Sequence, residues 1–132
     1  MQAKELMIGD WVECTYWKPS KRLRVAEIRR VMDDETKIGV YSDEYVLIFN
    51  QREIEPIPLT TEILEKNGWV KDLYCNESYD NDECEMLSFW IGEDGKNSFW
   101  WHAGLELVIP INYVHELQRA LKLCGIEKEI IL

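Results

Sequence analysis

Few residues in this sequence have the type and spacing that catalysis or metal binding requires. A metallopeptidase helix needs a second histidine four positions after the first, but the position four after His115 is Arg119. Zinc-binding cysteines usually lie two to four residues apart so that both thiolates reach one ion, whereas eight residues separate Cys75 from Cys84. These two could still meet across a loop beside His102, but unrelated free thiols are the simpler interpretation. We therefore predict no metal ion and no cofactor.

His102 is the best candidate for a catalytic base, because nucleophilic catalysis pairs an activated Ser, Thr or Cys with a histidine. It could act on Ser88 or Ser98 across a hairpin. The sequence has no Gly-x-Ser-x-Gly elbow, no Walker A loop and no Gly-x-Gly-x-x-Gly loop, so the usual hydrolase and nucleotide-binding signatures are missing. A small hydrolase around His102 is an alternative, and the leading hypothesis below assigns no catalytic residue.

Aromatic side chains are more informative, because six Trp and six Tyr are many for 132 residues. Alternate residues of a strand share a face, so two sets of rings are expected on opposite faces of a hairpin near residues 87–102. Further rings lie near expected loops in the first half of the chain. We take seven side chains as candidate binding residues: Tyr16, Trp17, Tyr41, Tyr45, Trp90, Trp100 and His102. Packing in the core or at its rim is the competing interpretation, because Trp is usually largely buried.

The net charge of −10 argues against a general nucleic-acid binder, which needs positive charge to displace counterions, and against binding to anionic membranes. Residues 60–132 are the more acidic half, with fourteen acidic and six basic side chains. Residues 72–85 hold six acidic side chains and no basic one, so an acidic phage-type inhibitor or DNA mimic is a second hypothesis. The basic cluster within residues 18–30 could meet phosphates or an acidic partner, although charges that protect a strand edge are the simpler explanation.

The elements that would position these side chains begin with several short strands. Residues 6–59 alternate short apolar runs with turn signals, a pattern typical of a small barrel or sandwich. A short helix is expected next, with Thr60 as its N-cap and Gly68 just after its end. Leu59 and Leu64 then stand where a hydrophobic staple forms, which fixes the angle at which the chain enters the helix.

The second half is expected to contain a hairpin and a C-terminal helix. Asp94-Gly95 predicts the hairpin turn, and Asn112 and Gly125 bracket an amphipathic helix with His115 on the solvent side of its wheel. Residues 72–85 are expected to form a mobile excursion. Strands are expected at residues 86–91, 98–103, 105–109 and, as an edge strand at the chain end, 129–132.

Two resemblances add to this pattern. The run Ile8-Gly9-Asp10-Trp11-Val12, with the short turn before a last strand at residues 50–59, resembles SH3-like small barrels, which implies that fold for the first half. A second set of residues resembles a group of small uncharacterised proteins from gut-bacterial and prophage genomes. It comprises Ile54-Glu55-Pro56-Ile57-Pro58-Leu59-Thr60 with Glu62, Leu64 and Gly68, and Tyr113-Val114-His115-Glu116-Leu117-Gln118 with Gly125. That resemblance implies a bacterial or phage context and a cytoplasmic location, and it brings no activity.

We therefore predict one compact α+β domain over residues 1–132. Its subdivisions are an SH3-like small β-barrel over residues 1–59 and, over 60–132, a hairpin-containing α/β half with a C-terminal amphipathic helix. The lack of a signal peptide, and of an apolar run of about 20 residues, predicts a cytoplasmic protein with reduced thiols. The leading functional hypothesis is a non-enzymatic module that binds another protein through aromatic surface residues. The sequence leaves the oligomeric state open.

Overall fold

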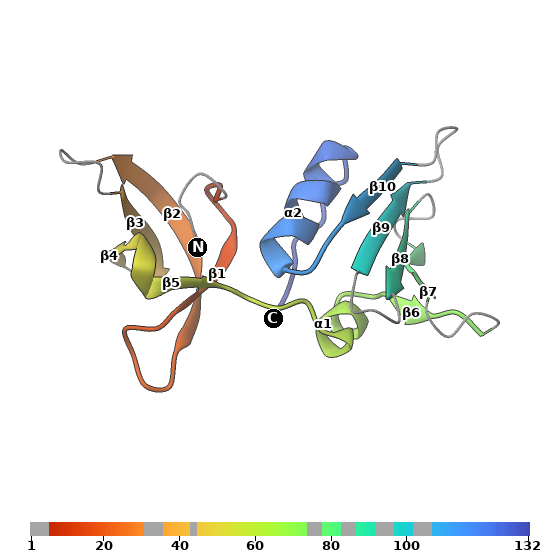
Figure 1. The fold of residues 1–132 in the computed structure, drawn as a ribbon, viewed down its shortest axis with the longest axis horizontal. Helices are drawn as coiled ribbons and strands as arrows, with labels where there is room; N and C mark the ends of the chain where they lie inside the picture. Colours follow the sequence, from red (N-terminus) through yellow and green to blue (C-terminus); the bar gives the residue numbers. More distant parts are fainter. Residues whose placement is uncertain are drawn as a thin grey trace. The chain divides into compact units, whose positions relative to one another are not determined.

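The computed structural model confirms a mixed, sheet-rich α+β fold with antiparallel sheets and two α-helices (Figure 1). It describes residues 6–30, 36–42, 45–73, 78–82, 87–91, 97–101 and 107–132, with the backbone alone at 30, 87, 99–101 and 107–109. The chain divides into two compact units, residues 1–57 and 58–132, close to the expected boundary after residue 59. The expectation that both units share one core stays a prediction.

The first unit is a five-stranded sheet with the strand order β4-β3-β2-β1-β5. Its strands are β1 (Trp11–Cys14), β2 (Lys21–Arg30), β3 (Thr36–Ser42), β4 (Tyr45–Asn50) and β5 (Ile54–Pro56), and the 3-10 turn η2 (Gln51–Glu53) joins the last two. Every neighbouring pair is antiparallel. No pairing between β4 and β5 closes the sheet among the described residues, so the structure confirms the β-rich half but not a barrel.

The core of the first unit forms on one face of this sheet, because alternate strand residues are apolar. Its members are Leu6, Val12, Cys14, Val25, Ile38, Val40, Phe49 and Ile54. Trp17, Leu23 and Leu47 are partly buried and pack against this cluster. At the entrance to β1, Gly9 has φ +94°, a conformation that glycine adopts without strain, and its N–H donates to the carbonyl of Val25 at 2.8 Å.

The turn after β4 is held by a carboxylate and tied back to the end of β1. Oε2 of Glu53 accepts a hydrogen bond from the Asn50 N–H at 3.0 Å. The Glu53 carbonyl accepts from the N–H of Thr15 at 2.9 Å and from its Oγ1 at 3.1 Å. These bonds bring η2 beside the segment that follows β1, where two of the candidate aromatic residues lie.

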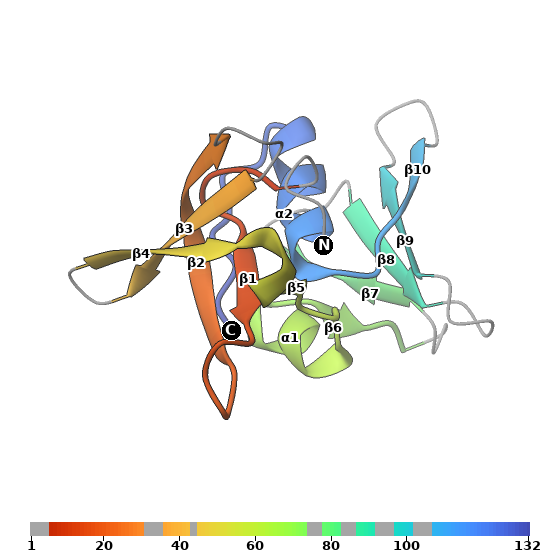
Figure 2. The same ribbon diagram turned by 60° about the vertical axis from the view of Figure 1, so that its left-hand side comes forward.

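The second unit is another antiparallel five-stranded sheet, with α2 along one face (Figures 1 and 2). The strand order is β10-β9-β8-β7-β6. The strands are β6 (Val70–Lys71), β7 (Ser78–Asp80), β8 (Leu87–Ile91), β9 (Asn97–Trp101) and β10 (Leu107–Pro110), and the helices are α1 (Thr61–Lys66) and α2 (Val114–Leu123). Neither helix in the described part of the chain is long and apolar enough to cross a membrane.

Helix α1 begins and ends where its sequence predicts. Oγ1 of Thr60 accepts a hydrogen bond from the Ile63 N–H at 3.3 Å, so Thr60 is the N-cap. Leu59 and Leu64 are both buried, as a hydrophobic staple requires. Gly68 has φ +91° directly after the cap residue, which confirms its role in ending the helix.

The hairpin of the second unit has the expected pairing, and one acidic segment is more ordered than expected. In β8 and β9, Trp90 pairs with Ser98 while Phe89 pairs with Phe99, so alternation separates their faces. Phe89 is buried and Trp90 is partly exposed, so the two faces differ as alternation predicts. The prediction of a mobile excursion is wrong for residues 78–82, because β7 pairs with β8 and buries Tyr79.

The prediction that His115 faces solvent is wrong. Its side chain is only 4% exposed, and its ring stacks on Tyr113 with centroids 5.9 Å apart. Tyr113, not Asn112, occupies the N-cap position of α2, and Oε1 of Glu116 accepts from the N–H groups of both at 3.1 Å. The buried positions of α2 therefore extend around more of the helix than one apolar stripe.

The chain end docks through a side chain, not through the expected edge strand. Asn67 is buried, and its amide donates to the Ile131 carbonyl and accepts from the Ile131 N–H, both at 2.7 Å. This reciprocal pair satisfies the backbone as a neighbouring strand would. Ile130 is buried beside it, which explains the apolar character of the last residues.

Candidate functional site

Three aromatic rings of the first unit meet in one cluster. The centroids of Tyr16 and Trp17 lie 5.6 Å apart with their planes at 88°, and both lie 5.4 Å from the centroid of Phe49. These are favourable edge-to-face and tilted arrangements of aromatic rings. Trp17 packs against the core, whereas Tyr16 is 65% exposed. The cluster therefore offers one exposed ring, Tyr16, beside a partly buried and a buried ring.

A hollow of about 360 Å³ lies beside these rings. Its lining residues are Tyr16, Trp17, Leu47, Ile48, Phe49 and Glu53. Three of them, Leu47, Ile48 and Phe49, are consecutive in β4. Because successive side chains of a strand point to opposite faces, contact with all three places the hollow next to the strand's backbone.

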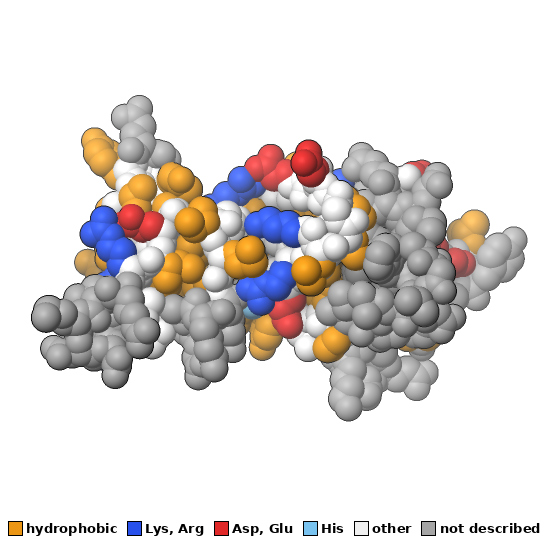
Figure 3. All heavy atoms as spheres, turned by 90° about the horizontal axis from the view of Figure 1, so that it is seen from above, with side chains coloured by type: hydrophobic (Ala, Val, Ile, Leu, Met, Phe, Trp, Pro, Cys, Tyr) orange, Lys and Arg blue, Asp and Glu red, His pale blue; other side chains and the backbone are white. Residues whose placement is uncertain are grey.

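The strand that borders the hollow is an edge strand. β4 pairs with β3 on one side, and no strand within the described ranges pairs with its other side. β4 contains no charged residue and no proline. On the face opposite the core, Val46 and Ile48 are exposed next to Tyr41 of β3. Figure 3 shows hydrophobic side chains at the surface of this unit, next to basic ones.

One basic side chain contacts a ring that lines the hollow, and two more are neighbours in sequence of lining residues, although the chain as a whole is acidic. Nζ of Lys21 lies 4.6 Å from the centroid of the Trp17 ring, a cation–π distance. Lys18 and Arg52 are exposed and adjacent in sequence to the lining residues Trp17 and Glu53. The Glu53 carboxylate is already engaged by the Asn50 N–H.

The thiol nearest to this cluster is not suited to catalysis. Cys14 is fully buried in the core on which Trp17 packs. Burial, followed by the nearby carboxylates of Glu13 and Glu53, raises the pKa of the Cys14 thiol to about 11. A nucleophilic cysteine needs a lowered pKa and access to solvent, so Cys14 is a structural residue.

The structure brings together two of the four aromatic residues predicted in the first unit. Tyr16 and Trp17 share the hollow, whereas Tyr41 and Tyr45 do not line it. Tyr41, 52% exposed, pairs with Val46 on the face opposite the core. Tyr45, 71% exposed, pairs with Ser42 at the start of β4.

The remaining predicted residues belong to the second unit. Trp90 is 37% exposed and stands between Ser78 of β7 and Ser98 of β9. Trp100 pairs with Ser88 in the backbone register, and its side chain lies outside the described residues. His102 also lies outside them, so the hydrolase alternative stays a prediction.

Sequence reasoning missed the residues of β4 and η2 that line the hollow. Phe49, Leu47 and Glu53 were not among the candidates, although Tyr45–Phe49 is an uncharged apolar run. That run has the pattern of an ordinary buried strand. Its position at the sheet edge depends on pairing with distant residues, so the run alone does not reveal it. The signal that could have singled it out is the absence of any charge or proline to protect an edge.

The described residues form no site that supports the acidic inhibitor or DNA mimic, or the metal-binding alternative. Of the acidic residues in 72–85, Asp72, Asp80 and Asp82 are described, and Oδ1 of Asp80 accepts from Oγ of Ser88 at 2.7 Å. Within the described ranges, no group of three or more His, Cys, Asp or Glu side chains could hold a metal ion. Cys75 and Cys84 lie outside those ranges.

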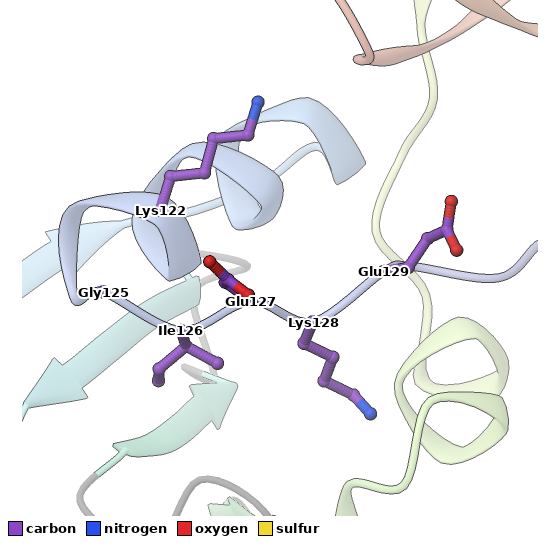
Figure 4. Close-up of a pocket in the computed structure, with 6 residues that line it drawn as sticks. All are labelled: Lys122, Gly125, Ile126, Glu127, Lys128 and Glu129. Atoms are coloured by element: carbon purple, nitrogen blue, oxygen red, sulfur yellow. The ribbon is translucent and has the colours of Figure 1, made fainter.

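A second hollow, of about 550 Å³, lies beside the chain that follows α2 (Figure 4). It is lined by Lys122, Gly125, Ile126, Glu127, Lys128 and Glu129. The two ammonium groups and the two carboxylates point in different directions in Figure 4. Such an arrangement does not converge on one ligand atom, so this hollow is a weaker candidate than the one beside β4.

Comparison of the chain with protein-family models, curated proteins and solved structures finds no match.

Proposed function

We propose that the first unit is a non-enzymatic interaction module that binds an extended segment of another protein in the hollow beside β4. The observation that carries this proposal is the hollow itself, which joins the exposed ring of Tyr16 to the backbone of an uncharged strand with no partner on its outer side among the described residues. An added strand gains main-chain hydrogen bonds from such an edge, and pockets for its alternate side chains supply specificity. Tyr16 is the exposed contact, while Trp17 and Phe49 form the apolar base.

The strand arrangement supports an SH3-like fold for this unit as part of the same proposal. The supporting observations are the antiparallel order β4-β3-β2-β1-β5 and the 3-10 turn between β4 and β5, taken together with the resemblance of residues 8–12. Small barrels of this kind commonly bind extended peptides through aromatic grooves. Fold alone does not establish function, so the proposal depends on the hollow.

A display selection tests the proposal. The full chain would be used to select binders from a library of random peptides of about twelve residues, and their affinities measured by fluorescence anisotropy. Tyr16→Ala should weaken binding about tenfold or more, because an aromatic hot spot is lost. Tyr41→Ala removes an equally large, exposed ring outside the hollow and serves as the matched control.

Both tyrosines are more than half exposed, so neither substitution should unfold the chain, and circular dichroism would check this. Binders that lose affinity with Tyr41→Ala but not with Tyr16→Ala would contradict the proposed site. A selection that yields no binder would count against the function itself.

A further inference from the structure

The charges around the hollow indicate which segments it prefers. The chain carries a net charge of −10, yet the exposed side chains next to the lining residues Trp17 and Glu53 include Lys18, Lys21 and Arg52. No salt bridge among the described residues engages these three cations. The segments that contribute the lining residues therefore carry exposed basic side chains on an acidic protein.

The nearby carboxylates of Glu13 and Glu53 offset these basic side chains only in part, because the three exposed cations outnumber the carboxylates. Oε1 of Glu13 accepts from Oγ of Ser20 at 2.9 Å, and Oε2 of Glu53 accepts from the Asn50 N–H at 3.0 Å. Glu53 lines the hollow, and its backbone carbonyl accepts from the Thr15 N–H. The excess of cations leaves this region with a positive local charge.

We propose that the occupant of the hollow is an extended, acidic peptide segment of a partner protein. This inference rests on the proposed function and specifies its ligand. Apolar side chains of the segment would face Tyr16 and Trp17, and Asp or Glu side chains before and after them would face Lys18, Lys21 and Arg52. The acidic surface elsewhere on the chain would repel the same segment from other positions, so charge would guide it to this edge.

The same random-peptide selection tests this inference, because the charge of the enriched peptides is read directly from their sequences. The expected result is enrichment of peptides that combine alternating apolar residues with Asp or Glu. Replacing Lys18 and Lys21 with Gln should then weaken the best acidic peptide by about two- to fivefold per lysine at low salt. The difference should shrink as salt is raised, because screening weakens exposed ion pairs.

The matched control is the double substitution of Lys71 and Lys122 by Gln. It removes the same charge from exposed positions of the second unit and should leave the affinity unchanged. Neutral or basic peptides that still require Tyr16 would overturn the acidic preference and leave the proposed function standing. Peptides indifferent to Tyr16→Ala, or no peptides at all, would overturn both.

One further outcome would assign a different occupant to the edge of β4. If analytical ultracentrifugation shows a dimer that Ile48→Lys converts to a monomer, the edge of β4 pairs with a second copy of this chain. The acidic-peptide inference would then be wrong. A monomer at all measured concentrations is the result that the inference requires.

Discussion

The edge strands of the two sheets differ in length, charge and proline content. In the second unit, one edge strand, β6, has only two residues, one of them Lys71, and the other, β10, ends in Pro110. In the first unit, β5 carries Glu55 and Pro56, whereas β4 offers six residues without a charge or a proline. Short length, charge and proline are the usual means of preventing unwanted strand pairing. Only β4, among these described edges, lacks all three.

On the proposed function, this difference marks where the molecule accepts another strand. An unprotected edge is a liability unless pairing with a partner is its role. In that proposal the hollow beside β4 and the exposed ring of Tyr16 would supply the side-chain contacts that make such pairing selective. The account therefore predicts that changes in the first sheet affect binding, whereas equivalent changes in the second sheet affect stability alone.

The largest expected effects compare one phenylalanine from each sheet. Phe89→Ala should lower the free energy of unfolding by about 5 kcal/mol, and Phe49→Ala by about 3 kcal/mol, because Phe49 borders a hollow and has fewer contacts to lose. Urea denaturation would measure both. Phe49→Ala should also weaken peptide binding. A larger loss of stability for Phe49→Ala than for Phe89→Ala would contradict the difference in packing.

A smaller effect concerns pH and the core below the hollow. Folding raises the pKa of Cys14 from 9.0 to about 11, chiefly by burial, so the folded state holds this proton more tightly than the unfolded state does. The resulting stabilisation is complete below pH 9 and is lost as the pH rises toward 11. It amounts to on the order of 2 kcal/mol.

The comparison of Cys14→Ala with the parent chain isolates that contribution. Urea denaturation between pH 8 and pH 11 should show a shallower loss of stability for Cys14→Ala. Cys124 is a partly exposed thiol of the second unit, so Cys124→Ala serves as the control. Its stability should fall over this pH range nearly as much as that of the parent chain. Equal slopes for the parent and Cys14→Ala would show that this thiol does not hold its proton as described.

Adding one charged residue to each of the edge strands β4 and β6 should have the smallest effect on stability. Its effect on binding should differ clearly between the two strands. Ile48→Glu and Val70→Glu each place a glutamate at an exposed edge position, and each should change the free energy of unfolding by no more than about 0.5 kcal/mol. Ile48→Glu should weaken peptide binding about tenfold, because it adds a charge to the edge that pairs and repels an acidic peptide. Val70→Glu should leave binding intact. Equal effects of the two would remove the distinction between the sheets.

Local signals in the sequence predicted much of the fold. Thr60 and Gly68 act on neighbouring backbone groups, so the ends of α1 could be placed from residue type alone. The alternation around Phe89 and Trp90 likewise assigned the faces of β8 correctly. His115 could not be placed in this way, because polarity predicts exposure while tertiary packing buries the ring beside Tyr113.

The candidate site was only half predictable for a related reason. Tyr16 and Trp17 stand out in the sequence as neighbouring aromatic residues. Their partner Phe49 is distant in sequence and meets them only when β4 and η2 fold against the segment that follows β1. Tyr41 and Tyr45 are residues of the same type, but neither lines the hollow. Which strand becomes an edge is decided by pairing between distant segments, and the lack of charge and proline in β4 is only an indirect local signal of it.

Amide hydrogen exchange in the presence and absence of a selected peptide tests the central claim most directly. If the peptide adds a strand to β4, amides within residues 45–50 that are unpaired in the free protein should become protected. Those of the edge strands β6 and β10 should exchange as before. Unchanged exchange in β4, with protection appearing at an edge of the second sheet instead, would contradict the account.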